Sequence, residues 1–178
     1  GGAVALLPVF AGEILMVGPK GLGFLRAAPA FGAVLMSLIL AYRPPLKNTG
    51  KYLLYSVAGF GMCIIIFAIS ENFWLSLVTL FLSGMFDNVS VVIRSTIIQL
   101  FTPDEMRGRV ASINSIFVGS SNEIGSFESG LAARIMGVVP SVIFGGSMTL
   151  LTVIITGKFA SDLYRLNLSE IIRQQESG

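Results

Sequence analysis

The sequence contains no histidine and only one cysteine, Cys63. Without histidine, the chain lacks the commonest metal ligand and the side chain that most often transfers protons near neutral pH. A lone cysteine cannot form a disulfide within the chain, and it does not make a thiolate metal site. The absence of histidine also excludes a serine–histidine enzyme. We therefore expect no catalytic residue, no metal site and no cofactor.

Charged residues are also scarce, at 12% of the chain against 53% hydrophobic residues, with a mean hydropathy of +0.80. A soluble domain carries about 25% charged residues, so this composition indicates an integral membrane protein whose surroundings are a lipid bilayer. No Walker A sequence is present, so the chain has no nucleotide motor of its own. A membrane aspartyl protease would need two aspartates within spans, and only Asp87 qualifies. Neither an enzyme nor a nucleic-acid-binding protein is predicted.

Apolar stretches divide the chain into membrane spans, each of which needs about 20 mostly apolar residues. We predict an all-α bundle over residues 1–158, with five complete spans and the end of a sixth, followed by a cytoplasmic tail at 159–178. Because the first apolar run is half a span long, we interpret the chain as part of a longer protein. The predicted spans are 1–12, 21–42, 51–69, 73–100, 110–133 and 138–156.

Lysine and arginine are distributed unequally between the two sides of this predicted bundle. One side carries eight of them, against Lys20 and Arg134 on the other. Cytoplasmic loops are enriched in these residues, so the eight-residue side and the C-terminus are predicted to be cytoplasmic. The tail has apolar residues near helical spacing, which leaves open an amphipathic helix on the membrane or a frayed end. The eight are Arg43, Lys47, Lys51, Arg107, Arg109, Lys158, Arg165 and Arg173.

A polar stripe follows one face of the span 73–100 and contains Asp87 and Arg94. A charge at bilayer depth costs at least about 2.5–3.5 kcal/mol, so such residues face protein or a water-filled cavity. Asp87 lies ~20 Å from the cytoplasmic end, near mid-bilayer. The two charges are either a proton- or substrate-coupled pair or a structural ion pair, and each can instead have a partner on another helix. The stripe comprises Ser76, Thr79, Ser83, Asp87, Ser90 and Arg94.

The span 110–133 is polar enough to be marginal as a membrane helix. It carries Asn122 and two acids, Glu123 and Glu128, which point in different directions on a helix. Glu123 is level with Asp87, which favours a proton carrier. Glu128 is level with Arg26, which favours an outer gate or a charge pair buried by packing.

The connection TPDEMRGR has a plain structural interpretation. Thr102 and Glu105 have the spacing of a capping box, with Pro103 at the first helical position. Small residues elsewhere are expected to let helices pack closely in lipid. They are Gly59, Gly61, Ser83, Gly84, Gly119, Gly125, Gly130, Gly145 and Gly146.

Several of these stretches together resemble the major facilitator superfamily. The motif TPDEMRGRV, followed by SNEIGSFESG, is similar to the branch that contains the bacterial enterobactin exporter and the macrolide-efflux proteins. GPKGLGFLRAAPAFGA and DNVSVVIRSTIIQLFTPDEMRGRV are similar to the second half of that branch. The resemblance implies the C-terminal half, helices 7–12, of a twelve-helix transporter that works by alternating access.

The resemblance also implies roles for single residues. Arg107, Gly108 and Arg109, with Asp104 before them, correspond to a cytoplasmic-loop motif. Asn122, Glu123 and Glu128 correspond to the polar motif of helix eleven, and Arg26 to the charged start of helix eight.

Proton-driven export of a small molecule, a siderophore or drug-like compound, is the function that the resemblance implies. The location would be the bacterial inner membrane, and the partners would be the substrate, protons and the missing N-terminal half. Transport of another solute, import, or a channel or scaffold role remain alternatives.

Overall fold

The computed structural model describes residues 2–42 and 49–159, and within these ranges the chain is all-α. The predicted tail beyond residue 159, with Arg165 and Arg173, lies outside the described residues, as do Arg43 and Lys47. The helices are α1 (Gly2–Val9), the π-helix η1 (Phe10–Ile14), α2 (Gly18–Tyr42), α3 (Thr49–Ile69), α4 (Phe73–Phe101), the 3-10 turn η2 (Asp104–Met106), α5 (Arg107–Met136) and α6 (Val138–Phe159).

Four of these helices are long and apolar enough to cross a membrane: α2, α3, α4 and α6. The helix α5 has sufficient length, at 30 residues, but it is the least hydrophobic of the long helices and is not among the four. Its serines, asparagines and glutamates lower its hydropathy. None of its residues is buried by the described part of the chain, whereas α6 buries Ser141 and Val142.

The apolar core lies at one end of the bundle, where α1 and η1 meet α2, α3 and α4. Phe10 and Phe67 are fully buried, with ring centroids 4.7 Å apart. Leu7 and Leu25 are equally inaccessible and belong to the same cluster. Burying such side chains stabilises a fold by about 1.5–3 kcal/mol each in water, although in lipid the gain comes mainly from packing. The core closes the bundle at this end.

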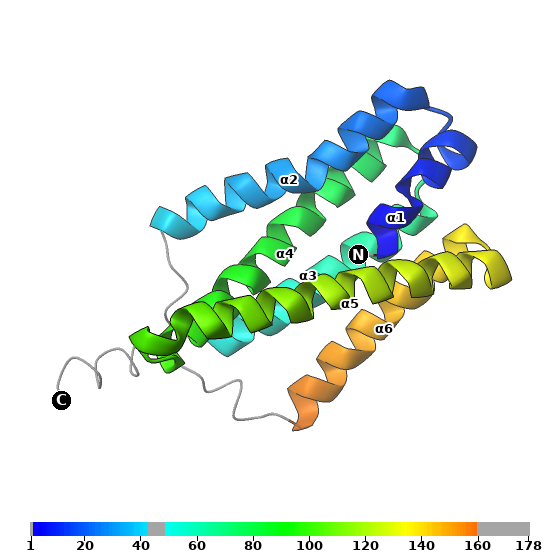
Figure 1. Cartoon of the computed structure of the whole chain (residues 1–178). Helices are drawn as coiled ribbons and strands as arrows, with labels where there is room; N and C mark the ends of the chain where they lie inside the picture. Colours follow the sequence, from blue (N-terminus) through cyan, green and yellow to red (C-terminus); the bar gives the residue numbers. More distant parts are fainter. Residues whose placement is uncertain (1, 43–48, 160–178) are drawn as a thin grey trace.

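The helices α2 and α4 approach each other more closely than side chains would allow, and Figure 1 shows them running side by side. A methyl group added at Gly84 would lie 2.6 Å from the Cα of Pro29, and one added at Gly32 would lie 3.0 Å from the carbonyl carbon of Phe81. The backbones of the two helices are therefore in contact. The prediction that small residues permit close packing is confirmed for Gly84.

The same prediction is confirmed between α3 and α6 at Gly61 and Gly146, but it is wrong for three glycines of α5 and for Gly145 of α6. A methyl group at Gly146 would lie 2.6 Å from Ile65, and one at Gly61 would lie 3.3 Å from the carbonyl oxygen of Gly146. Four of the predicted packing glycines instead face open space, because no neighbouring helix comes within 4 Å of the position that a side chain would take. These four are Gly119, Gly125, Gly130 and Gly145.

The turn between α4 and α5 differs from the predicted capping box. The Thr102 hydroxyl donates to the carbonyl oxygen of Ile98 at 2.6 Å and so closes the last turn of α4. The residue before the first turn of α5 is Met106, whose side chain makes no capping hydrogen bond. The chain needs the short turn η2 to reverse direction, with the Met106 amide donating to the Pro103 carbonyl. Thr102 is therefore too early to cap α5.

Candidate functional site

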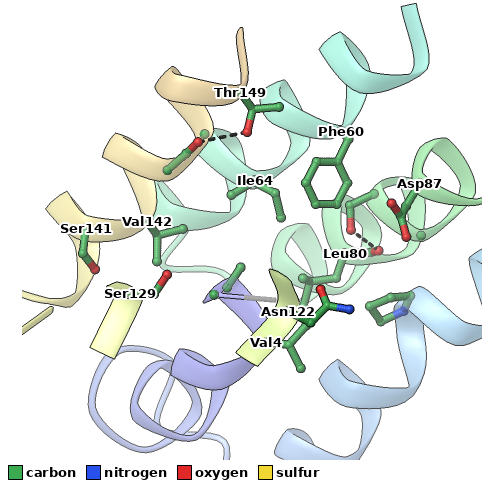
Figure 2. Close-up of a pocket in the computed structure, with 17 residues that line it drawn as sticks. Val4, Phe60, Ile64, Leu80, Asp87, Asn122, Ser129, Ser141, Val142 and Thr149 are labelled. Atoms are coloured by element: carbon green, nitrogen blue, oxygen red, sulfur yellow. Dashed lines mark hydrogen bonds between the residues drawn. The ribbon is translucent and has the colours of Figure 1, made fainter. Parts of the chain in front are cut away.

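A cavity of about 320 Å³ lies where α1 to α6 converge. Figure 2 shows Asp87 and Asn122 toward one side of it and Ser129 and Ser141 toward the other, with Phe60, Ile64 and Leu80 among the apolar lining. The cavity thus has an acid and several neutral hydrogen-bonding groups within an otherwise apolar wall. Its polar lining residues are Ser83, Asp87, Asn122, Ser129, Ser141 and Thr149.

The polar stripe of α4 explains why Asp87 faces this cavity. The stripe begins among buried residues whose hydroxyls are already used: Thr79 donates to the carbonyl oxygen of Leu75 at 2.9 Å, and Ser83 to that of Leu80 at 2.7 Å. Asp87 is exposed, and no hydrogen bond or ion pair within the described residues involves its carboxylate. Thr79 and Ser83 in the stripe therefore pack against other helices with their hydroxyls satisfied, whereas the Asp87 carboxylate remains available to a ligand or a proton.

A second cavity, of about 570 Å³, separates the last turns of α4 from the first half of α5. Arg94 lines it from α4, and Asn122 lines both this cavity and the central one. Figure 1 shows α5 crossing the bundle and meeting α6 at their shared turn, from which the two helices diverge. The helix α5 packs on α1 and α6 but makes little contact with α4, and this separation leaves the cavity.

A third, smaller cavity of about 140 Å³ continues the second toward the turn between α4 and α5. The two share Ser95, Ile98, Asn114 and Ser115, and the third adds Arg107. Asn122 therefore links the first cavity to the second, and Asn114 links the second to the third, with Asp87 in the first cavity and Arg107 in the third. Polar groups follow this line from the centre of the bundle to the end of α4.

The structure brings together some of the predicted site residues and leaves others apart. Asp87 and Asn122 share the central cavity, and Arg94 shares the second one with Asn122. Three predicted residues are exposed and line none of these three cavities: Arg26, Glu123 and Glu128. In the conformation described here, the residues that the structure covers contain neither an Asp87–Arg94 nor an Arg26–Glu128 ion pair.

The predicted loop motif lies beside the third cavity. Arg107 begins α5 and lines that cavity, whereas Arg109 is exposed and outside its lining. Gly108 has open space where a side chain would lie. Asp104 begins the turn η2. No group of three or more His, Cys, Asp or Glu that could hold a metal ion occurs in the described part of the chain.

Sequence reasoning missed Asn88, which joins α4 to α2. Its Nδ2 donates to the Ser37 hydroxyl at 2.6 Å and also to the carbonyl oxygen of Ala33. Hydrogen bonds between helices in lipid contribute roughly 0.6–1.7 kcal/mol. Asn88 lies beside Asp87 in the sequence but points about 100° away, off the polar stripe. An isolated asparagine on an apolar helix face was the signal that could have identified it.

Comparison with known proteins was informative at the level of family. A family model described as transmembrane secretion effector, of the major facilitator type, matches residues 2–172. No curated protein and no solved structure gives a significant match.

Proposed function

Since the chain belongs to the transmembrane secretion effector family of the major facilitator superfamily, we propose that it is part of a proton-driven exporter of a small molecule. Membership of this family makes the chain a membrane transporter component. The observation that carries the finer proposal is the central cavity, which residues of α1 to α6 line together with an exposed acid, Asp87. A ligand and a proton can both reach such a group.

The architecture supports alternating access with a second helical half. The helix α5 has no buried residue within the described chain, and its glycines face open space. A polar helix so placed needs another surface to face in the membrane, because lipid would not solvate it. We assign the chain to the C-terminal half, with the N-terminal half covering α5 and completing the cavities. Motion of one half against the other would then expose the site to each side in turn.

Proton coupling is assigned to acids, because the sequence has no histidine. Asp87 is the first candidate, since its carboxylate lines the central cavity without a partner among the described residues. Glu123 is the second, because it adjoins Asn122 on α5 and is exposed on the surface assigned to the other half. Asn122 would hydrogen-bond the substrate between the two cavities. Arg26 and Glu128 are assigned to gating.

The bacterial inner membrane is the proposed location, with the C-terminus in the cytoplasm. Exposed aromatic residues support this placement of the bundle: Tyr42 and Tyr52 lie at the end of α2 and the start of α3, whereas Trp74 lies at the start of α4. Tyrosine and tryptophan are enriched at both membrane–water interfaces. Arg107 and Arg109 are at the same end of the bundle as Tyr42, which supports the assignment of that end to the cytoplasm.

Compound accumulation in cells that express the full-length protein tests the proposal, with and without a protonophore. Lower accumulation that the protonophore abolishes is the expected result, and Asp87→Asn and Glu123→Gln should each remove it while the protein still reaches the membrane. Glu71→Gln, an acid exposed in the turn before α4, serves as the control. An unchanged protonophore-sensitive efflux in both acid variants would contradict the proton-carrier assignment. Uptake instead of efflux would reverse the proposed direction.

A further inference from the structure

The cavity between α4 and α5 has the size of a small-molecule site. Its volume is about 570 Å³, and ligand pockets commonly measure about 300–1,000 Å³. It is larger than the central cavity and is formed by only two helices.

Among the described residues that line this cavity, Arg94 is the one that carries a charge, and most of its hydrogen-bonding capacity is unused by them. Its Nε donates to the carbonyl oxygen of Ser90 at 3.3 Å, and no other hydrogen bond or ion pair of Arg94 occurs within the described residues. The two terminal nitrogens of the guanidinium group are therefore available. They form a planar fork that matches the oxygens of a carboxylate, sulfonate or phosphate.

The nearest acid on the same helix does not neutralise this charge. Asp87 lies two helical turns away, ~10 Å along the axis, and it lines the central cavity instead. None of the described residues that line the cavity with Arg94 has a carboxylate. An unpaired cation at membrane depth is unfavourable, so a bound anion would stabilise this arrangement.

The remaining walls indicate the rest of the ligand. Asn114 and Asn122 present side-chain amides with no hydrogen bond to any described residue, and these amides can donate to an anionic group. Val91, Ile97, Ile98 and Val118 form the apolar part of the lining. A ligand that matches both has a charged end and a hydrophobic body.

We propose that this cavity binds an amphipathic organic anion, with its negatively charged oxygens on Arg94 and its apolar body against the isoleucines and valines. The inference rests on the proposed transport function and specifies its substrate class. It also places the anion and the coupling carboxylate in adjoining cavities that share Asn122. Substrate and proton then occupy separate places.

Binding of fluorescent probes to the full-length protein in lipid nanodiscs tests the inference directly. The probes are dansyl-leucine, an amphipathic anion, and dansyl-leucinamide, which has the same body without the charge. Dansyl-leucine should bind about tenfold more tightly, as expected for one charge-assisted pair. Arg94→Gln should abolish this preference but leave binding of the neutral probe unchanged, which also shows that the variant is folded. Arg94→Lys should retain part of it, because the charge remains without the fork. The control is Arg134→Gln, an exposed arginine outside the cavity lining.

The outcomes separate this inference from the transport proposal. Equal affinity for the two probes, or a preference that survives in Arg94→Gln, would overturn the inference. So would protonophore-sensitive efflux that is confined to neutral or cationic compounds, although transport itself would stand. An Arg94-dependent preference without any efflux would support the anion site and refute the export proposal.

Discussion

Helix α4 meets α2 and α5 in opposite ways. Along α2 it makes backbone contact at Gly32 and Gly84, reinforced by the hydrogen bonds of Asn88. Along α5 it is separated by a cavity lined by Arg94 and Asn114. Polar residues occur on α4 facing both α2 and α5, so polarity alone does not bring helices together. In this bundle, small residues and a satisfied donor accompany the packed pair, whereas polar groups without partners among the described residues line the cavity.

Adding a methyl group tests the packed pair with the largest expected effect. Gly84→Ala places its new carbon 2.6 Å from the Cα atom of Pro29, so the helices must move apart. We expect a loss of about 2–3 kcal/mol in unfolding free energy, typical of overpacking. Gly119→Ala should instead be neutral or stabilise by up to about 1 kcal/mol, because alanine favours helix and the space is open. Unfolding in a denaturing detergent measures both, and equal losses would refute the contrast.

Thiol labelling sharpens the contrast next, and the single native cysteine makes it practical. In a Cys63→Ala background, Ser115→Cys should react with a charged methanethiosulfonate about tenfold faster than Ser83→Cys, because reactivity follows exposure. Ser115 is exposed beside the second cavity, whereas Ser83 is 3% exposed. Similar rates would mean that α5 closes over α4 in the membrane.

Removing the side-chain amide of Asn88 should lower the free energy of unfolding moderately, whereas removing that of Asn114 should change it little. Asn88→Ala deletes the hydrogen bonds to Ala33 and Ser37, and we expect a cost of about 1 kcal/mol. Asn114→Ala is the matched control, because its side chain makes no hydrogen bond among the described residues. Its cost should fall within about 0.5 kcal/mol. Detergent unfolding compares them, and a larger loss in the control would reverse the assignment.

The smallest effect is expected at the turn that joins α4 to α5. Thr102→Val removes the hydroxyl that donates to Ile98, a partly exposed hydrogen bond at a helix end, and should cost about 0.5 kcal/mol. If Thr102 capped α5 instead, the loss would typically be ~1 kcal/mol and up to about 2. Thermal unfolding distinguishes the two values.

Much of this fold follows from sequence, because runs of apolar residues and their interruptions fix where membrane helices begin and end. The polar stripe of α4 correctly indicated a helix facing something other than lipid. Sequence could not show that Ser83 closes on its own backbone while Asp87 opens to a cavity. That division depends on which neighbour covers each turn. The spacing of Thr102 and Glu105 suggested a cap, but the tight turn η2 moved the start of α5 past it.

The glycines also show what sequence cannot predict. Composition identifies small residues but not their partners, so Gly84 and Gly119 were equivalent in sequence and differ completely in structure. Whether a glycine packs depends on the path of the neighbouring helix. The helix α5 diverges from α4, and this geometry is a property of the whole bundle.

The backbone contacts that α2 and α4 make at Gly32 and Gly84 also have a consequence for evolution. Because backbone meets backbone there, shrinking one side cannot compensate for enlarging the other. Selection should therefore hold both positions at glycine across homologues, whatever each one transports. The lining of the α4–α5 cavity is under no such constraint, so it can drift toward new ligands. A constrained α2–α4 pair beside a variable cavity lining would let proteins of one fold change their substrates without a change of fold.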